Sequence, residues 1–210
     1  MAEKGLKVFR EPAYRLIDPV VQWIVRMKIH PNAISTMGFV ATIAAGLSYH
    51  QDHVRTAGLL VLLGGIIDIF DGQVARESGL ESKFGAFYDS TLDRLSEVVV
   101  FVGLASLYNT FRADVEDVAM VYVILMALGG SLLVSYTRAR AEGLGLDCKV
   151  GLMQRAERVV LLGLGSAIFG LAWDGLILDL IIIIVAVFTN LTAIQRIVWV
   201  YQHGKGVPLE

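Results

Sequence analysis

Residues 56–76 read TAGLLVLLGGIIDIFDGQVAR, an apolar run that carries two aspartates, Asp68 and Asp71, near its end. A helix that crosses a membrane needs about 20 mostly apolar residues at a rise of about 1.5 Å each. Acidic side chains within such a run are costly in lipid and are tolerated where they line a polar cavity. The stretch therefore predicts a transmembrane helix with one polar, functional end.

The rest of the chain repeats this pattern of apolar stretches. Five more have suitable length, at residues 33–49, 86–109, 116–138, 157–174 and 176–201. The 210-residue chain is 55% hydrophobic and 18% charged, against about 25% charged residues in ordinary globular chains, and its mean hydropathy is +0.62. We predict an all-α integral membrane protein with one domain, residues 1–210, and a six-helix transmembrane core, residues 31–202, around a polar cavity open to the cytoplasm.

Ahead of this core, residues 11–29 read EPAYRLIDPVVQWIVRMKI. Val20, Val21 and Ile24 recur at helical spacing with basic residues on either side, which predicts an amphipathic helix in the membrane interface. A short core helix is the alternative. Residues 1–30 thus form a juxtamembrane segment, and the sequence HPNAIST that follows predicts a helix start capped by Asn32.

The distribution of lysine and arginine predicts the orientation in the membrane. These residues concentrate in the N-terminal arm, in residues 138–158 and at Lys83 and Lys205, whereas the loops 50–55, 110–115 and 173–176 hold only Arg55 and Arg112. Basic loops stay in the cytoplasm. We therefore expect a multi-pass protein of the cell (inner) membrane with both termini and the active site on the cytoplasmic side. The apolar stretches make the lipid bilayer a partner, and the formal net charge of -2 gives no indication of nucleic-acid binding.

Four aspartates form two pairs within DIFDGQVAR, residues 68–76, and GAFYDSTLD, residues 85–93. Asp68 and Asp71 are three residues apart and Asp89 and Asp93 four, so each pair shares a helix face. A short turn between the helices brings the four carboxylates to one point, where their mutual repulsion calls for a cation. Oxygen ligands without nearby histidine or cysteine favour Mg²⁺, Mn²⁺ or Ca²⁺. Two acidic pairs suit two ions, as in many phosphoryl-transfer sites.

The same two stretches carry a longer pattern. They fit D-x-x-D-G-x-x-A-R-x(8)-G-x-x-x-D-x-x-x-D at every fixed position, and the chain therefore resembles the CDP-alcohol phosphotransferase family. The resemblance implies that a phosphatidyl group passes from CDP-diacylglycerol to an alcohol with release of CMP. It implies that Asp68, Asp71 and Asp89 bind Mg²⁺ or Mn²⁺, and that Asp93 binds metal and acts as general base. It also assigns eight residues to CDP-lipid binding: Pro31, Asn32, Ala33, Ile34, Gly72, Ala75, Arg76 and Ser82.

Three arginines bear on the identity of the acceptor. Arg138 lies in SYTRARAE, Arg155 in GLMQRAER and Arg196 in the last apolar stretch, and guanidinium groups favour an acceptor that carries its own phosphate. The two patterns resemble those of prokaryotic phosphatidylinositol-phosphate synthases, which implies inositol phosphate, although those enzymes carry lysine at the position of Arg138. Glycerol 3-phosphate, and thus a phosphatidylglycerol-phosphate synthase, remains an alternative. A cation transporter that uses the aspartates as its ion site is the alternative of another class.

Small residues also gather in the fourth apolar stretch. Gly129, Gly130 and Ser131 follow one another there, and small side chains let membrane helices approach closely. They predict a close helix contact, either within one chain or between the chains of a homodimer.

Overall fold

The structure is a computed structural model that describes residues 17–112 and 115–205. Within these residues the chain forms long helices and connecting turns: α2 (Pro31–His50), α3 (Val54–Ser78), α4 (Lys83–Thr110), α5 (Val115–Glu142), α6 (Arg155–Phe169) and α7 (Leu176–Gly204). Residues 17–26 add a short helix ahead of α2. The prediction of an all-α protein is confirmed.

Each predicted apolar stretch corresponds to one of the helices α2 to α7. Among the described residues, three segments are long and apolar enough to cross a membrane: Val54–Ser78, Val118–Glu142 and Leu176–Gly204. The prediction for residues 157–174 was too long. The helix α6 already ends at Phe169, because Gly170 has a φ of 57°, a left-handed conformation that does not continue an α-helix.

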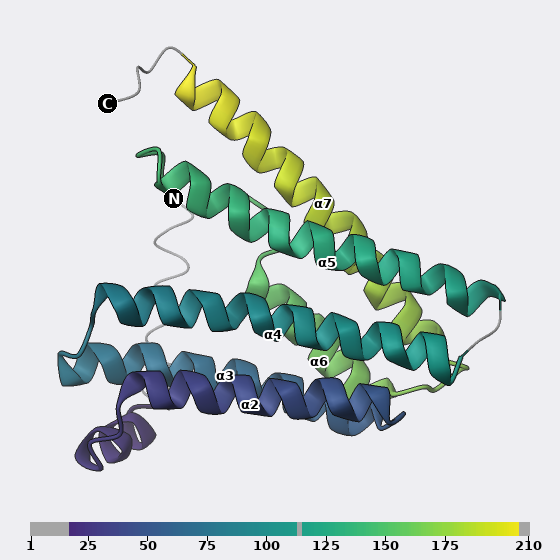
Figure 1. Cartoon of the computed structure of the whole chain (residues 1–210), viewed down its shortest axis with the longest axis horizontal. Helices are drawn as coiled ribbons and strands as arrows, with labels where there is room; N and C mark the ends of the chain where they lie inside the picture. The colour runs from purple at the N-terminus through teal and green to yellow at the C-terminus, as the bar shows by residue number, and fades with distance from the viewer. Residues whose placement is uncertain (1–16, 113–114, 206–210) are drawn as a thin grey trace.

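The helices form two groups. Helix α2 packs on α3 and α4, and α5 packs on α7. The groups are joined by α4, which packs on α5, and by α6, which contacts both α3 and α7. In Figure 1 the C-terminal end of α3 and the N-terminal ends of α2 and α4 lie together at the left of the bundle. The polar ends predicted for the second and third apolar stretches therefore meet at one end of the molecule.

Helices α2 and α4 approach each other through glycine. A Cβ atom added to Gly103 would lie 2.5 Å from the carbonyl oxygen of Gly46 and 2.7 Å from its Cα atom. Such backbone-to-backbone packing is how membrane helices gain close contact without a large hydrophobic driving force. The Gly46–Gly103 contact keeps α4, which carries Asp89 and Asp93, close to α2.

Substitution of Gly103 by alanine is expected to destabilise the protein. Because the added methyl group meets backbone and cannot be accommodated by a side-chain rotation, α2 and α4 must separate, and we expect the free energy of unfolding to fall by about 1–3 kcal/mol. Thermal unfolding in detergent measures this change. Gly129→Ala is the matched control, because nothing lies within 4 Å of a Cβ atom there. Equal stability of the two variants would contradict this contact.

The contact predicted from Gly129, Gly130 and Ser131 forms within the chain at one of these residues. A Cβ atom on Gly130 would lie 2.7 Å from Nδ2 of Asn190 in α7. The Asn190 amide donates a hydrogen bond of 3.1 Å to the carbonyl oxygen of Met126. Gly130 therefore allows the close packing of α5 on α7.

The start of α2 differs from the prediction. His30, and not Asn32, caps the helix: its Nδ1 atom accepts a hydrogen bond of 3.2 Å from the Asn32 N–H. Pro31 then occupies the first turn, where its missing N–H costs nothing and its φ suits a helix. At the start of α4, Ser82 is the cap, and its Oγ atom accepts a hydrogen bond of 3.0 Å from the Gly85 N–H.

The short helix of residues 17–26 packs beside the start of α2. Val21 is 1% exposed and lies in a small apolar cluster with Ile34 and Val74, whereas Trp23 and Met27 are more than half exposed. The remainder of the predicted juxtamembrane segment, residues 1–16, lies outside the described residues. The short helix thus buries one apolar face against α2 and α3, while other apolar side chains of this segment are exposed on the surface.

Candidate active site

The four aspartates lie on the two helices whose ends meet at the left of Figure 1. Asp68 and Asp71 belong to the last turns of α3, and Asp89 and Asp93 to the first turns of α4. Asp89 is close enough to interact electrostatically with both Asp68 and Asp71. The two pairs therefore lie at the same end of the bundle, with Asp89 close to both residues of the first pair.

A glycine in α2 makes room for one of these carboxylates. A Cβ atom on Gly38 would lie 2.8 Å from Oδ1 of Asp68 and 3.2 Å from the side chain of Ile67. Any larger side chain would push Asp68 away, since Gly38 also faces the backbone of Gly64, at 3.4 Å. Helix α2 thus limits where the Asp68 carboxylate can lie.

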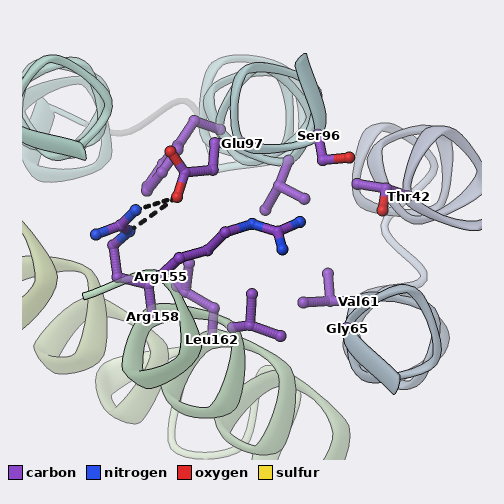
Figure 2. A pocket seen from close by; sticks show the side chains of 11 residues that line it. Thr42, Val61, Gly65, Ser96, Glu97, Arg155, Arg158 and Leu162 are labelled. Atoms are coloured by element: carbon purple, nitrogen blue, oxygen red, sulfur yellow. Dashed lines mark hydrogen bonds and ion pairs between the residues drawn. The ribbon is translucent and has the colours of Figure 1, made fainter. Parts of the chain in front are cut away.

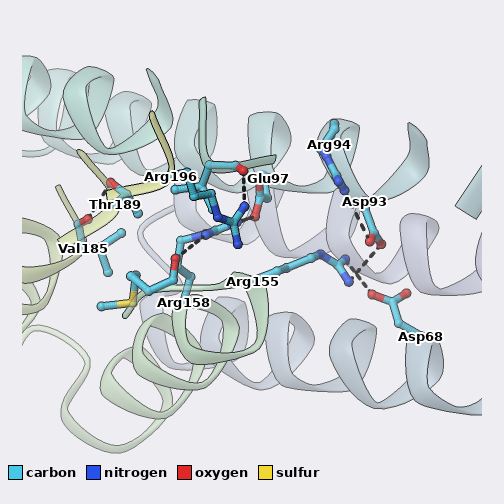
Figure 3. Close-up of polar contacts among 11 residues, drawn as sticks. Asp68, Asp93, Arg94, Glu97, Arg155, Arg158, Val185, Thr189 and Arg196 are labelled. Carbon is cyan, nitrogen blue, oxygen red and sulfur yellow. Dashed lines mark hydrogen bonds and ion pairs between the residues drawn. The ribbon is translucent and has the colours of Figure 1, made fainter. Parts of the chain in front are cut away.

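Arg155, the first residue of α6, joins the two aspartate pairs. Its Nη2 atom lies 2.6 Å from Oδ2 of Asp68 and its Nη1 atom 2.9 Å from Oδ1 of Asp93. Figure 3 shows the Arg155 side chain reaching between these carboxylates, with Arg94 on the far side of Asp93. Arg94 is 3.5 Å from Asp93 and is more exposed. A cation therefore already bridges α3 and α4 at this point.

The carboxylates fit divalent metal ions chemically. Asp71 is only 4% exposed, and its Oδ2 atom has no hydrogen-bond partner among the described residues, so a buried oxygen remains for a ligand. The donors are all carboxylate oxygens, the type that Mg²⁺ and Mn²⁺ prefer. In the described parts of the chain no three acidic, histidine or cysteine side chains already stand at metal-binding distances, and Arg155 takes the cation position at Asp68 and Asp93.

A cavity of about 210 Å³ opens beside Asp71 and Asp89. Its walls include six of the eight residues assigned to CDP-lipid binding: Pro31, Asn32, Gly72, Ala75, Arg76 and Ser82. Ser35, Leu80, Glu81, Gly85 and Ala86 complete the lining. Ala33 and Ile34 do not line it, and Ile34 instead packs with Val21 and Val74.

Gly72 and Arg76 indicate which type of ligand this cavity can bind. A Cβ atom on Gly72 would have its nearest neighbours, the Arg76 guanidinium nitrogens, at 3.7 Å, so the backbone of Gly72 faces open space. Arg76 lies one turn further along α3 and is exposed. A bare backbone next to a guanidinium group suits a phosphate-containing ligand that approaches closely.

The three arginines of the predicted acceptor pocket have different partners. Arg155 binds Asp68 and Asp93, as described above, and the Arg138 Nε atom donates a hydrogen bond of 2.8 Å to Glu142. Arg196 is 2% exposed, and it donates to the carbonyl oxygen of Val150 at 2.8 Å and to that of Val134. Of the three, Arg155 is the one whose guanidinium group pairs with the aspartates among the described residues.

Sequence reasoning missed one acidic residue close to this site. Glu97 follows Asp93 by four residues on α4, and its Oε1 atom accepts hydrogen bonds from both Nε and Nη2 of Arg158 in α6. Figure 2 shows this pair beside Arg155 at a second cavity, of about 40 Å³. The sequence does contain a signal for Glu97, because it is an acidic residue within an apolar stretch, four residues after Asp93.

Comparison with known proteins agrees with this geometry. A family model described as CDP-alcohol phosphatidyltransferase matches residues 28–192. The archaetidylinositol phosphate synthase of Methanothermobacter thermautotrophicus is 36% identical over 203 residues, which cover 97% of each chain. The phosphatidylinositol phosphate synthase of Streptomyces avermitilis is 33% identical, over 90% of this chain and 80% of that protein.

Solved structures share the fold. The crystal structure of Mycobacterium tuberculosis phosphatidylinositol phosphate synthase with CDP-DAG bound superposes with a TM-score of 0.79 and 28% identity, over 89% of this chain and 94% of that one. The same enzyme in complex with manganese and citrate gives a TM-score of 0.78 at 28% identity, over 87% and 88% of the two chains. The chain belongs to the CDP-alcohol phosphatidyltransferase family, which confirms the transferase prediction over that of a cation transporter.

Proposed function

We propose that the protein transfers the phosphatidyl group of CDP-diacylglycerol to inositol phosphate and releases CMP. The observation that carries this proposal is the position of Arg155. A guanidinium group next to Asp93 offers a binding site for a phosphate at the point where a carboxylate can take a proton. The relatives named for inositol phosphate lipid synthesis support the acceptor, and the related structure with CDP-DAG bound supports the donor.

The donor is proposed to lie in the cavity beside Asp71. Gly72, Ala75 and Arg76 line one side of it, on α3, and are assigned to the cytidine and pyrophosphate. Pro31, Asn32, Ala33 and Ile34 at the start of α2, with Ser82 at the start of α4, are assigned to the remainder of the CDP-lipid.

Asp93 is proposed to act as the general base. Its carboxylate accepts the proton of the acceptor hydroxyl, the hydroxyl oxygen forms a bond to the lipid-linked phosphorus, and the bond from that phosphorus to CMP breaks with its electron pair leaving on CMP. Two Mg²⁺ or Mn²⁺ ions held by Asp68, Asp71, Asp89 and Asp93 would neutralise the negative charge on the pyrophosphate and on the leaving group. The manganese complex of the related synthase supports the type of metal.

Arg155 is proposed to bind the acceptor phosphate, with Arg138 and Arg196 adding positive charge behind it. Arg155→Gln is expected to raise the acceptor KM by at least about tenfold, the size of one lost charge-assisted contact. The donor KM should stay within about twofold because Arg155 does not line the cavity beside Asp71. Steady-state kinetics of CMP release measures both. Arg94→Gln is the matched control, since Arg94 also neighbours Asp93 but has no proposed role, and an unchanged acceptor KM in Arg155→Gln would contradict the assignment.

The experiment that tests the proposed function is an acceptor panel. The full-length protein receives CDP-diacylglycerol, Mg²⁺ or Mn²⁺, and in turn inositol phosphate, glycerol 3-phosphate, inositol, serine or no acceptor, while CMP release is followed. We expect release with inositol phosphate only. Release with glycerol 3-phosphate alone would indicate a phosphatidylglycerol-phosphate synthase, and release with unphosphorylated inositol would remove the phosphate-binding role of Arg155.

The arrangement in the membrane is also a proposal. We propose a single domain with six transmembrane helices, α2 to α7, an amphipathic interfacial segment before them, and both termini with the active site on the cytoplasmic side of the inner membrane. Exposed leucine and isoleucine side chains on α3 and α7, such as Leu59, Leu63, Ile194 and Ile197, support a lipid-facing exterior. We further propose a homodimer, and the mass of the detergent-solubilised protein by light scattering tests it.

A further inference from the structure

Two ion pairs connect α4 with α6, one helical turn apart. The first joins Asp93 to Arg155 and the second Glu97 to Arg158. The two acids are four residues apart on α4 and the two arginines three apart on α6, so each set lies on one helix face. The second pair is more buried than the first, with side-chain exposures of 3% and 8% against 24% and 19%, and Figure 3 shows residues of both pairs. The Glu97–Arg158 pair is therefore placed to influence how α6 presents Arg155.

The inner pair is almost completely buried. Arg158 is 2% exposed and Glu97 is 7% exposed, and the Arg158 Nε atom lies 3.1 Å from Oε1 of Glu97. The surrounding side chains of Val100, Phe101 and Leu162 line the same small cavity (Figure 2). In such an environment each partner depends on the other, because an ion left without its partner there would be an uncompensated buried charge.

Arg158 also holds the segment that leads into α6. Its Nη1 atom donates a hydrogen bond of 3.2 Å to the carbonyl oxygen of Met153. From the other side, Oγ1 of Thr192 in α7 accepts hydrogen bonds from the N–H groups of Leu152 and Met153, at 3.2 and 3.0 Å. The backbone is thus anchored two residues before Arg155. The side chain of Gln154 provides no cap for α6, and these contacts, together with that of Arg196 to the carbonyl oxygen of Val150, hold the segment that leads into the helix.

We propose that Glu97 and Arg158 are positioning residues that hold Arg155 in reach of Asp68 and Asp93 and so set where the acceptor phosphate binds. The inference rests on the proposed function, which assigns that phosphate to Arg155. Glu97 spans from α4 to α6, and α4 is itself held against α2 by the Gly46–Gly103 contact. Further along the helix, α6 packs on α3 through the close backbone contact of Gly58 with Gly163, so the part of α6 that the pair holds is its first turn, which carries Arg155.

This arrangement separates the two substrates. The cavity assigned to the CDP-lipid is lined by residues of α2, α3, α4 and the connection between α3 and α4, and α6 contributes none of its walls. A shift of the first turn of α6 consequently moves Arg155, whereas the walls of the donor cavity belong to other segments. A positioning role predicts that only the acceptor KM changes. A purely structural role predicts that the acceptor KM and the donor KM rise together.

The test compares three variants of the full-length protein with wild type. Glu97→Gln/Arg158→Gln replaces the ion pair by two neutral amides and leaves no buried charge unpaired. Glu97→Asp keeps the charge and shortens the link by one methylene group. Tyr49→Phe is the matched control: Tyr49 makes a buried hydrogen bond of 2.6 Å to Ser166, which ties α2 to the other end of α6, 11 residues from Arg155.

Acceptor and donor KM values from CMP release and the thermal midpoint are measured for each variant. We expect the double variant to raise the acceptor KM by about tenfold or more, Glu97→Asp to raise it by a smaller factor, and both to keep the donor KM within about twofold. Tyr49→Phe should lower the thermal midpoint without changing either KM. Addition of millimolar-range inositol phosphate should restore most of the double variant's maximal rate, since the chemical groups are intact.

Two results would overturn the inference. A double variant with the acceptor KM of wild type would show that Arg155 does not depend on the pair, and equal rises in both KM values would show a general structural role. Neither result affects the proposed function, which the wild type tests in the same assay. If wild type releases CMP only with unphosphorylated acceptors, the proposed function is wrong and the inference falls with it.

Discussion

Replacement of Asp93 by asparagine is expected to slow CMP release by a factor of about 10² to 10⁴, the usual contribution of a general base. Asparagine has the shape of aspartate but cannot accept the acceptor's proton. The donor cavity is lined by Asp71 and Asp89 and not by Asp93, so binding of CDP-diacylglycerol should persist. Single-turnover CMP release and equilibrium binding of labelled CDP-diacylglycerol measure the two effects separately.

The control for this substitution is Asp147→Asn. Asp147 lies in the connection between α5 and α6, where it pairs with Lys149 at 2.6 Å and both side chains are exposed. The same chemical change there should leave the rate unaltered. Wild-type turnover in Asp93→Asn would remove Asp93 from the role of base, and loss of donor binding together with turnover would assign it to the donor site.

Gly72→Leu is expected to abolish binding of the CDP-lipid. The backbone of Gly72 faces the cavity, and the nearest atoms to an added Cβ are the Arg76 guanidinium nitrogens at 3.7 Å. The protein can therefore hold a side chain at this position without a clash, and the side chain would occupy the space proposed for the ligand. We expect the donor KM to rise by about 100-fold or more, which corresponds to loss of about 3 kcal/mol of binding, while the thermal midpoint stays near that of wild type.

Gly129→Leu is the matched control, because it introduces the same side chain at a helical glycine without near neighbours and far from the cavity. It should change neither KM value. Normal donor binding by Gly72→Leu would show that the nucleotide lies elsewhere. A Gly72→Leu variant that fails to fold would contradict the free space that the structure gives to its side chain.

The sequence predicted the fold where hydrophobicity alone decides it. All six apolar stretches correspond to helices, since a long apolar run must satisfy its backbone hydrogen bonds internally. The errors lie at helix ends, where a single residue decides. Gly170 ends α6 earlier than hydropathy suggested, and His30 caps α2 through its ring nitrogen in place of Asn32, a role that helix-capping preferences do not suggest for histidine.

For the site, the sequence predicted which residues share a helix face and did not predict the contacts between helices. The spacing of Asp68, Asp71, Asp89 and Asp93 was enough to place each pair on one helix face, because helical periodicity relates residues three and four apart. The spacing does not say which cation lies between them, and the Arg155 contacts with Asp68 and Asp93 depend on how α6 packs against α3. Likewise Glu97 and Arg158 are 61 residues apart in the chain, so only the packed bundle reveals their pairing.

Arg196 shows most clearly that a sequence pattern does not identify the partner of a buried side chain. From the sequence, an arginine inside an apolar helix predicts a functional contact. In the fold its guanidinium group donates to the backbone carbonyls of Val150 and Val134. A buried arginine can satisfy its donors with backbone just as well as with a ligand, and periodicity cannot distinguish the two cases.

The most direct measurement is the mass of the lipid product. Wild-type protein is incubated with CDP-diacylglycerol, inositol phosphate and Mg²⁺, and the lipids are extracted for mass spectrometry. The account predicts a product with the mass of the diacylglycerol phosphate joined to inositol phosphate, with the acceptor's own phosphate retained and one CMP released for each product molecule. Phosphatidic acid from hydrolysis, a product without the second phosphate, or unchanged CDP-diacylglycerol would contradict it.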